Sequence, residues 1–190
     1  MNIDKQPVIF IVLATLAILV GTLATTFIPL FVGTTSVPLD KVVTYKPLEV
    51  EGRDIYIREG CNNCHTQTIR PLPFETARYG NPSKLEESAI DRPHLWGSKR
   101  TGPDLARVGT KYPAAWHVLH MKNPQSLFPQ SNMPAYPWLA ESKLDSGYTE
   151  KKMKVLGYPF NGEDLKAVQG KTELDALVAY LMRLGRELKD

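Results

Sequence analysis

The only two cysteines of this 190-residue chain are separated by two asparagines and followed directly by a histidine, in the string Cys61-Asn62-Asn63-Cys64-His65. A C-x-x-C-H string is the attachment signature of a c-type haem, in which both thiols bond to the porphyrin and the adjacent imidazole ligates the iron. One helical turn brings side chains three residues apart onto the same face. The string therefore predicts one covalently attached haem c, held by Cys61 and Cys64, with His65 as an axial ligand.

Three other uses of a cysteine pair fit less well. A structural zinc site usually has four Cys or His ligands, but the chain has no second cysteine pair, and His117 and His120 are spaced more closely than usual zinc-finger histidines. A thioredoxin-like redox pair would lie in a βαβ unit, which the flanking residues do not resemble. A structural disulfide would leave His65 without a role.

Met133 is the methionine best placed to be the second axial ligand. It lies in a proline-rich stretch, residues 129–137, and directly precedes Pro134, so the loop around it is expected to be stiff and extended. The remaining methionines are the initiator and three in helical patterns, where packing is the expected role: Met1, Met121, Met153 and Met182. The alternative is that Met133 only packs. His/Met ligation saturates the iron and raises its potential, which predicts electron transfer rather than oxygen or peroxide chemistry at this haem.

The N-terminal region predicts a membrane anchor. Residues 6–39 contain no Asp, Glu, Lys or Arg, and residues 8–32 are nearly all apolar. A helix needs about 20 such residues to cross a bilayer, so residues 8–32 are expected to span it and contact lipid, after a short head, residues 1–7. The alternative is a signal peptide, but its apolar core is usually only about 7–15 residues long.

The rest of the chain is predicted to be a linker, residues 33–48, and a mainly α, cytochrome c-type haem domain, residues 49–190. Helical patterns cover residues 49–59, 112–120 and, after a capping-box pattern, 172–185. In a cytochrome c fold the first and last of these helices cross. The residues expected near the crossing are Gly52, Tyr56, Val178 and either Tyr180 or Leu181.

The remaining charged and polar residues suggest no other function. The net charge is only +3, and no run of Lys or Arg forms a basic stripe, so nucleic acid is not an expected partner. The other histidines, His94, His117 and His120, are expected to be hydrogen-bonding or surface residues. Arginine matches a carboxylate with two hydrogen bonds. The arginines that could therefore bind the haem propionates are Arg70, Arg92, Arg100 and Arg107.

Longer strings resemble one family, the mono-haem subunit of cbb3-type cytochrome c oxidases, known as CcoO or FixO. These strings are Gly60 to His65, Ile69-Arg70-Pro71, Arg78-Tyr79-Gly80, Trp96 to Gly109, Trp116-His117 with His120, Asn123-Pro124, and Ser131 to Leu139. The resemblance covers the anchor and nearly all of the haem domain, and it is weakest in residues 145–171. Within the longest string, Thr101 to Leu105 resembles the loop of c-type cytochromes that implies a hydrogen bond from the axial histidine to the Pro103 carbonyl.

The resemblance implies a place in a terminal oxidase. The partners would be a catalytic subunit carrying haem b and a haem b3–copper centre, and a di-haem cytochrome c subunit, with a soluble cytochrome c as a further candidate donor. Electrons would pass through this haem to haem b, and oxygen would be reduced to water in the catalytic subunit. The chain would thus be a non-catalytic, electron-transfer subunit of an enzyme.

The location follows from the same family-level knowledge, because haem c is attached on the outer side of the bacterial cytoplasmic membrane or in the mitochondrial intermembrane space. The chain is expected to cross the inner membrane once, with its N-terminus in the cytoplasm and its haem domain in the periplasm. Alternative functions are the small cytochrome subunit of nitric oxide reductase and a membrane-anchored cytochrome c shuttle. A gas sensor would need a vacant or displaceable sixth ligand.

Overall fold

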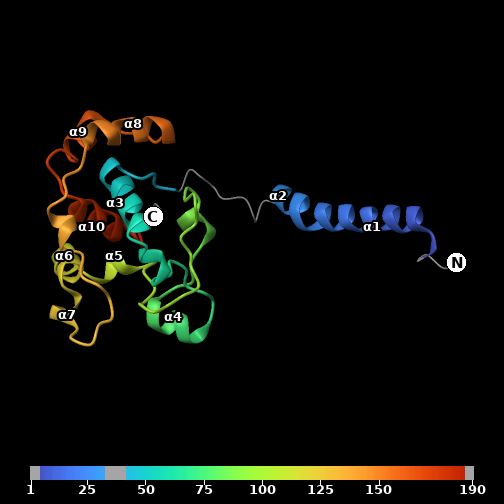
Figure 1. The fold of residues 1–190 in the computed structure, drawn as a ribbon, viewed down its shortest axis with the longest axis horizontal. Coiled ribbons are helices and arrows are strands. Elements are labelled where there is room, and N and C mark those ends of the chain that lie inside the picture. The colour runs from blue at the N-terminus through green and yellow to red at the C-terminus, as the bar shows by residue number, and fades with distance from the viewer. Residues whose placement is uncertain (1–4, 33–41, 187–190) are drawn as a thin grey trace. The chain divides into compact units, whose positions relative to one another are not determined.

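A computed structural model describes residues 5–32 and 42–186, and the chain divides into two compact units, Met1–Pro38 and Leu39–Asp190 (Figure 1). The expected head, residues 1–7, and linker, residues 33–48, therefore lie partly outside the described residues. The two units are described separately below.

The first unit contains one long apolar helix. It is built from α1 (Pro7–Thr22), a π-helical stretch (Leu23–Phe27) and α2 (Ile28–Phe31). Together these span 25 residues. The most apolar 18-residue window within them has a mean hydropathy of 2.6, and none of that window is buried against protein. Pro29 has no backbone N–H to donate, and the helix widens to the π form just before it. By length and composition the helix can cross a membrane, as was predicted for residues 8–32.

The second unit is mainly helical, as predicted. Its helices are α3 (Pro47–Arg58), α4 (Pro73–Tyr79), α5 (Val108–Lys111), α6 (Ala114–Lys122), α7 (Pro124–Leu127), α8 (Ser146–Leu156), α9 (Gly162–Lys166) and α10 (Glu173–Arg183). Three 3-10 turns lie at Cys61–Asn63, Leu85–Ser88 and Pro137–Ala140. An isolated antiparallel β-bridge pairs Lys143 with Thr172.

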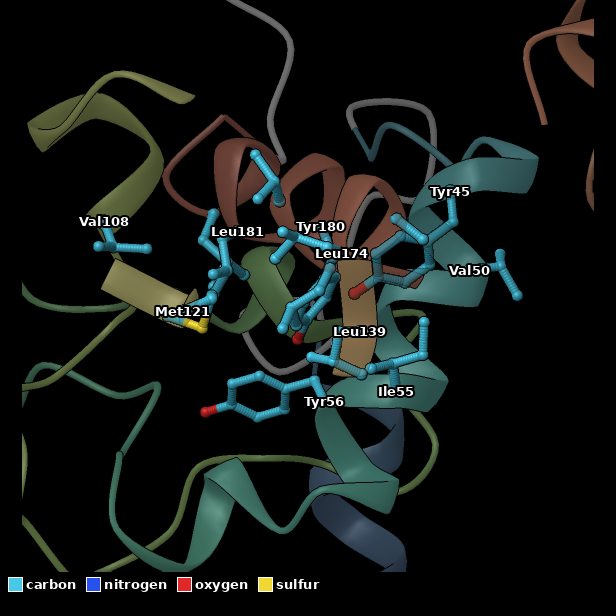
Figure 2. Close-up of a cluster of buried hydrophobic side chains, with 14 of the residues drawn as sticks. Tyr45, Val50, Ile55, Tyr56, Val108, Met121, Leu139, Leu174, Tyr180 and Leu181 are labelled. Atoms are coloured by element: carbon cyan, nitrogen blue, oxygen red, sulfur yellow. The ribbon is translucent and has the colours of Figure 1, made fainter. Parts of the chain in front are cut away.

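Helices α3 and α10 cross in close contact, and Figure 2 shows their side chains meeting in the core. A Cβ atom placed on Gly52 would lie 1.9 Å from the carbonyl oxygen of Ala176, so only glycine allows this approach. The rings of Tyr56 and Tyr180 pack with their centroids 5.4 Å apart. Val178 and Leu181 are also buried. The predicted crossing is therefore confirmed, with Gly52, Tyr56 and Tyr180 at the contact.

The ends of these helices follow from local chemistry. Thr172 accepts a hydrogen bond from the Asp175 backbone N–H, and the Asp175 carboxylate accepts one from the Thr172 N–H, which forms the predicted capping box of α10. Helix α3 begins at Pro47, slightly earlier than the predicted residue 49, because proline suits the first helical position. Helix α6 begins at Ala114, after the extended Pro113, rather than at residue 112.

The segment that the resemblance covers least well, residues 145–171, forms α8 and α9 and packs on α3. The Lys152 ammonium lies 2.8 Å from Glu51 and 2.6 Å from Asp54, and the Thr149 hydroxyl donates to Glu51 at 2.8 Å. Met153, on α8, is completely buried. The segment is thus an integral layer over the first helix of the domain.

Candidate haem-binding site

The residues predicted to hold a haem line one cavity of about 540 Å³, which has mainly apolar walls. Cys61, Cys64, His65, Pro103 and Met133 all contribute to its lining, although they come from three separate stretches of the chain. Side chains of both crossing helices complete the wall, among them Tyr56 on α3 and Leu177 and Leu181 on α10. The volume is that of a site for a cofactor rather than for a single ion.

The cysteine string follows directly from α3. Gly60 adopts a left-handed conformation with φ of 71°, which ends the helix, and the next residues form the 3-10 turn Cys61–Asn63. The His65 N–H then donates to the Cys61 carbonyl at 3.0 Å, closing one turn. No disulfide joins the two cysteines, and burial raises the pKa of the Cys61 thiol to about 12. The expected turn is present in the 3-10 form.

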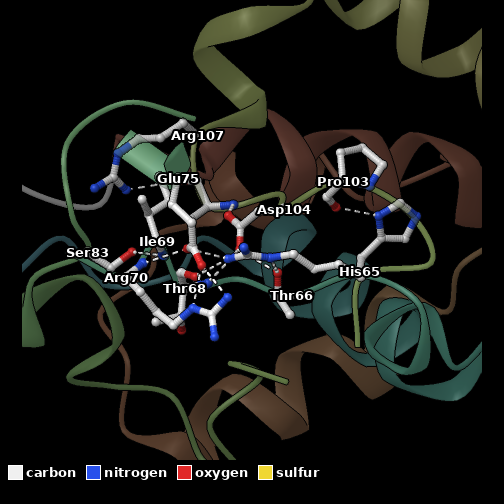
Figure 3. A network of polar contacts seen from close by, with 12 residues as sticks. His65, Thr66, Thr68, Ile69, Arg70, Glu75, Ser83, Pro103, Asp104 and Arg107 are labelled. Carbon is white, nitrogen blue, oxygen red and sulfur yellow. Dashed lines mark hydrogen bonds and ion pairs between the residues drawn. The ribbon is translucent and has the colours of Figure 1, made fainter. Parts of the chain in front are cut away.

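The imidazole of His65 is fixed by the loop that carries Pro103. Its Nδ1 lies 2.8 Å from the Pro103 carbonyl oxygen (Figure 3), so Nδ1 donates this hydrogen bond and Nε2 keeps the lone pair that a metal needs. Gly102 lies against the same ring, because a Cβ atom there would be 2.2 Å from His65 Cε1. The Gly102 N–H donates to the Cys64 carbonyl at 3.0 Å, which joins the loop to the cysteine string.

A buried polar network behind His65 holds the same two segments together (Figure 3). The Asp104 carboxylate accepts hydrogen bonds from the Thr66 hydroxyl at 2.6 Å and from the Thr68 N–H at 2.9 Å. The Arg100 guanidinium donates to the Thr66 hydroxyl at 2.8 Å and to Glu75 at 2.7 Å. The Glu75 side chain is completely buried, and its hydrogen bond with Arg100 is the main cause that lowers its pKa to about 2. Each buried charge is therefore paired.

Met133 lies on the stretch between α7 and the 3-10 turn Pro137–Ala140. The Gln125 side chain of α7 donates to the carbonyls of Ser131 at 3.1 Å and of Met133 at 2.9 Å. The Met133 N–H donates to the Ser131 hydroxyl at 3.2 Å, and the Tyr136 N–H donates to the Met121 carbonyl at 2.8 Å. The Met133 thioether is thus carried by a loop that hydrogen bonds attach to α6 and α7. Met121 and Met153 are buried in the hydrophobic core, as expected for packing residues, and Met121 also contributes to the lining of the cavity.

The arginines proposed for the propionates mostly have other partners. Arg70 and Arg100 pair with Glu75, Arg107 pairs with Glu87, and Arg92 donates to backbone carbonyls. Of these four, Arg107 alone is among the residues that line the cavity. Two further cations, Arg78 and Lys111, line it as well, and each stacks on the tyrosine that follows it. Arg78, Arg107 and Lys111 are thus the cations beside which propionates in this cavity would lie, and nothing in the sequence but positive charge pointed to Arg78 or Lys111.

Two histidines that the sequence left without a role also face the cavity. His117 and His120 lie one turn apart on α6 and both line it, whereas His94 stacks on Trp96 elsewhere. Burial lowers the pKa of His117 to about 4, and burial is likewise the main cause that lowers the pKa of His120. The spacing of the pair was visible in the sequence, but its position beside the cysteine string depends on the tertiary fold.

The donor set fits a haem: two thiols and an imidazole on one short string, a thioether on a second segment, and buried ring nitrogens of His117 and His120 that have no hydrogen-bond partner among the described residues. A helical domain that gathers these groups around one apolar cavity has the architecture of a mono-haem cytochrome. The chain belongs to the family of the mono-haem subunit of cytochrome c oxidase, FixO, whose model matches residues 1–172.

The family match confirms the resemblance to the CcoO/FixO subunit of cbb3-type oxidases. The chain is therefore a component of a cytochrome c oxidase and carries one haem. The match extends from the anchor to the start of α10, so it includes all five predicted site residues. A comparison with curated proteins finds no match.

The contact between Gly102 and His65 can be tested by substitution. In Gly102→Ala the new methyl group would overlap the imidazole, so the ring must move away from the Pro103 carbonyl. Loss of such a support typically weakens ligation by roughly 10–100-fold. We expect exogenous imidazole to displace the axial ligands at correspondingly lower concentration, measured by absorbance titration. Gly162→Ala is the matched control, because no atom lies within 4 Å of a Cβ atom there; equal titrations of the two variants would contradict the prediction.

Proposed function

We propose that this chain is the electron-transfer subunit of a cbb3-type oxidase, in which one covalently bound haem c has His65 and Met133 as axial ligands. The observation that carries this proposal is that both cysteines, the imidazole and the thioether line one cavity in a chain of the mono-haem oxidase family. In this scheme Cys61 and Cys64 form thioether bonds to the porphyrin. The chain supplies no catalytic residue.

The protein groups around the cavity have separable roles. Pro103 and Gly102 hold the His65 ring in one orientation, and the network of Asp104 and Arg100 keeps their loop in place. When bound, the haem supplies one-electron chemistry between ferric and ferrous iron. With both axial positions filled by protein, the chain itself offers oxygen no binding site.

The partners follow from the family. Electrons would come from the di-haem cytochrome c subunit or from a soluble cytochrome c, and would leave for haem b of the catalytic subunit, where the haem b3–copper centre reduces oxygen to water. Because haem c is attached outside the cytoplasmic membrane, the haem domain is assigned to the periplasm and the N-terminus to the cytoplasm. The long apolar helix, Pro7–Phe31, would be the anchor in the inner membrane. The family match favours this scheme over the small subunit of nitric oxide reductase or a free shuttle.

The oxidase assignment can be tested by identifying the proteins that co-purify with the chain. We expect the tagged full-length chain, purified from membranes in mild detergent, to bring with it a haem b protein that contains copper and a second cytochrome c. The preparation should reduce oxygen when supplied with reduced cytochrome c. Recovery of a partner with non-haem iron that reduces nitric oxide, or of no partner, would reject the assignment.

Covalent attachment is tested by removing one thiol. Cys64→Ala cannot form the second thioether bond, so we expect loss of most of the haem that stays with the chain in a denaturing gel, measured by haem staining. Asn63→Ala is the control, because this exposed side chain lies inside the same string but has no bond to make. A normal haem-stained band in Cys64→Ala would show that the cysteine pair is not the attachment site.

The second axial ligand is tested by removing the thioether. Met–Fe(III) cytochromes of this type have a weak far-red absorption band, and methionine ligation raises the potential. We therefore expect Met133→Ala to lose this band and to have a lower reduction potential, measured by redox titration. Met182→Leu is the control, since Met182 lies on α10 and packs against the core. If the band persists unchanged in Met133→Ala, another residue is the ligand.

A further inference from the structure

The chain enters the haem domain through a short non-helical stretch, residues 42–46, which precedes α3 and is called the entry segment below. Val42 is 7% exposed and Tyr45 is 4% exposed, although both lie near the start of the domain. The first residues of a domain are usually poorly ordered unless other groups tie them down. The entry segment is therefore held by specific contacts, and these come largely from α10 and α3.

Arg183, in the last turn of α10, holds the backbone of the entry segment. Its guanidinium donates hydrogen bonds to the carbonyls of Val43 and Thr44, the second at 3.1 Å. The same guanidinium pairs with the Glu49 carboxylate of α3 at 3.2 Å, and Arg183 as a whole is 7% exposed. A buried charge costs free energy unless it is paired and hydrogen-bonded. The two carbonyls of the entry segment thus meet donors of a cation that the core must satisfy.

Tyr45 fastens the entry segment by its side chain. The Arg183 guanidinium lies 4.2 Å from the centre of the Tyr45 ring, which also packs beside Tyr180 of α10 with centroids 6.2 Å apart (Figure 2). The Tyr45 hydroxyl donates to the Asp91 carboxylate at 2.6 Å, and Arg53 of α3 donates to the same oxygen at 3.0 Å. Backbone and side chain of the entry segment are therefore both joined to the two crossing helices.

We propose that Arg183 and Tyr45 form a clamp that fixes the end of the tether between the membrane anchor and the haem domain. With the clamp closed, the tether runs from Phe31, the last residue of α2, to Val43, and a chain of that length spans roughly 40 Å at most. With the clamp open, the tether extends to Pro47, where α3 begins. This inference rests on the proposed function, which places the apolar helix in the membrane.

The clamp serves electron transfer by limiting how far the haem can move. A longer tether lowers the effective concentration of a linked group at its target. A clamped entry segment therefore keeps the haem near an acceptor in the same membrane, as a fixed subunit requires. A shuttle would instead need a long tether. The clamp itself contacts neither iron nor porphyrin ligands, so its loss leaves the haem attached.

The clamp is tested by native proteolysis of the full-length chain with its attached haem, in detergent. Chymotrypsin cuts after tyrosine, so a haem-stained fragment that begins at Lys46 shows that the chain has been cut after Tyr45. We expect the wild-type chain to resist this cut. Arg183→Met should be cut roughly tenfold faster or more, because cleavage follows the population of the open form. Mass spectrometry of the fragment distinguishes this cut from cuts at other residues.

Arg58→Met is the matched control. Arg58 also joins α3 to α10, through two hydrogen bonds with Glu173, but at the other end of α3 from the entry segment. It should be cut after Tyr45 no faster than the wild type. If Arg183→Met fails to retain its haem, Arg183→Lys decides by the same criterion, since it keeps the charge but not the forked donors. Rapid cleavage of the wild type after Tyr45, or equal rates in the Arg183 and Arg58 variants, would overturn the proposal.

The effect on reach is measured in phosphatidylcholine vesicles that contain a lipid with a fluorescent headgroup, whose emission the haem quenches. Inserting Gly-Ser-Gly-Ser between Phe31 and Val42 lengthens the tether directly. We expect Arg183→Met to lower the quenching as this insertion does, and Arg58→Met to leave it unchanged. If Arg183→Met does not lower the quenching, whether or not the insertion does, the clamp does not set the reach of the haem.

The failure of this proposal and that of the proposed function are distinguishable, because neither measurement involves an oxidase partner. A chain that is resistant to cleavage but brings no oxidase with it rejects the oxidase assignment alone. A chain that does not insert into the vesicles rejects the membrane anchor. Fast cleavage after Tyr45 in a chain that co-purifies with the oxidase rejects only the clamp.

Discussion

The close crossing of α3 and α10 is the constraint on which the rest of the haem domain depends. Gly52 lets the backbones touch, and the side chains beside it then form the core: Tyr56 and Tyr180 at the contact, with Leu177 and Leu181 facing the cavity. Because the cysteine string follows α3 after a few residues, the crossing also fixes where the string lies relative to α10. Side chains of both crossing helices, Tyr56, Leu177 and Leu181, form part of the cavity wall.

A buried network of charged side chains positions the loop that supports His65. Two carboxylates, Glu75 and Asp104, lie in the interior, where an unpaired charge would be costly. Arg100 contacts both of them and also the Thr66 hydroxyl, so the residues after the cysteine string are joined to the loop that supports His65. A buried ion pair is weak evidence for stability, but several hydrogen bonds that must be met together define one geometry. Here that geometry is the orientation of the axial imidazole.

The elements that could be predicted from the sequence are those determined by local sequence patterns. These elements depend on residues that are close in the sequence or on one close contact. They are the apolar run, the capping box of α10, the helical patterns and the crossing residues, and the structure has them nearly where expected. The cysteine string, Pro103 and Met133 also lie around one cavity, and their roles as ligands and supports remain predictions. Pairing between distant charges was not predictable: Arg70 and Arg100 bind Glu75 instead of facing the cavity, while Arg78 and Lys111 line it. Residues 145–171 had no motif, yet they cover α3.

The separation of the candidate ligands along the chain has a mechanical consequence. The thioether bonds and His65 would fasten the haem just after α3, while Met133 would fasten it beyond α7, so the iron would tie together two parts of the chain that are remote in sequence. A tie of this kind closes a long loop and reduces the freedom of the unfolded chain, as a disulfide does. Its two ends would differ in permanence, since the thioether bonds are covalent and the Fe–S bond can open. The cofactor of this domain would then also be a reversible cross-link, releasing the Met133 loop before the remainder of the fold.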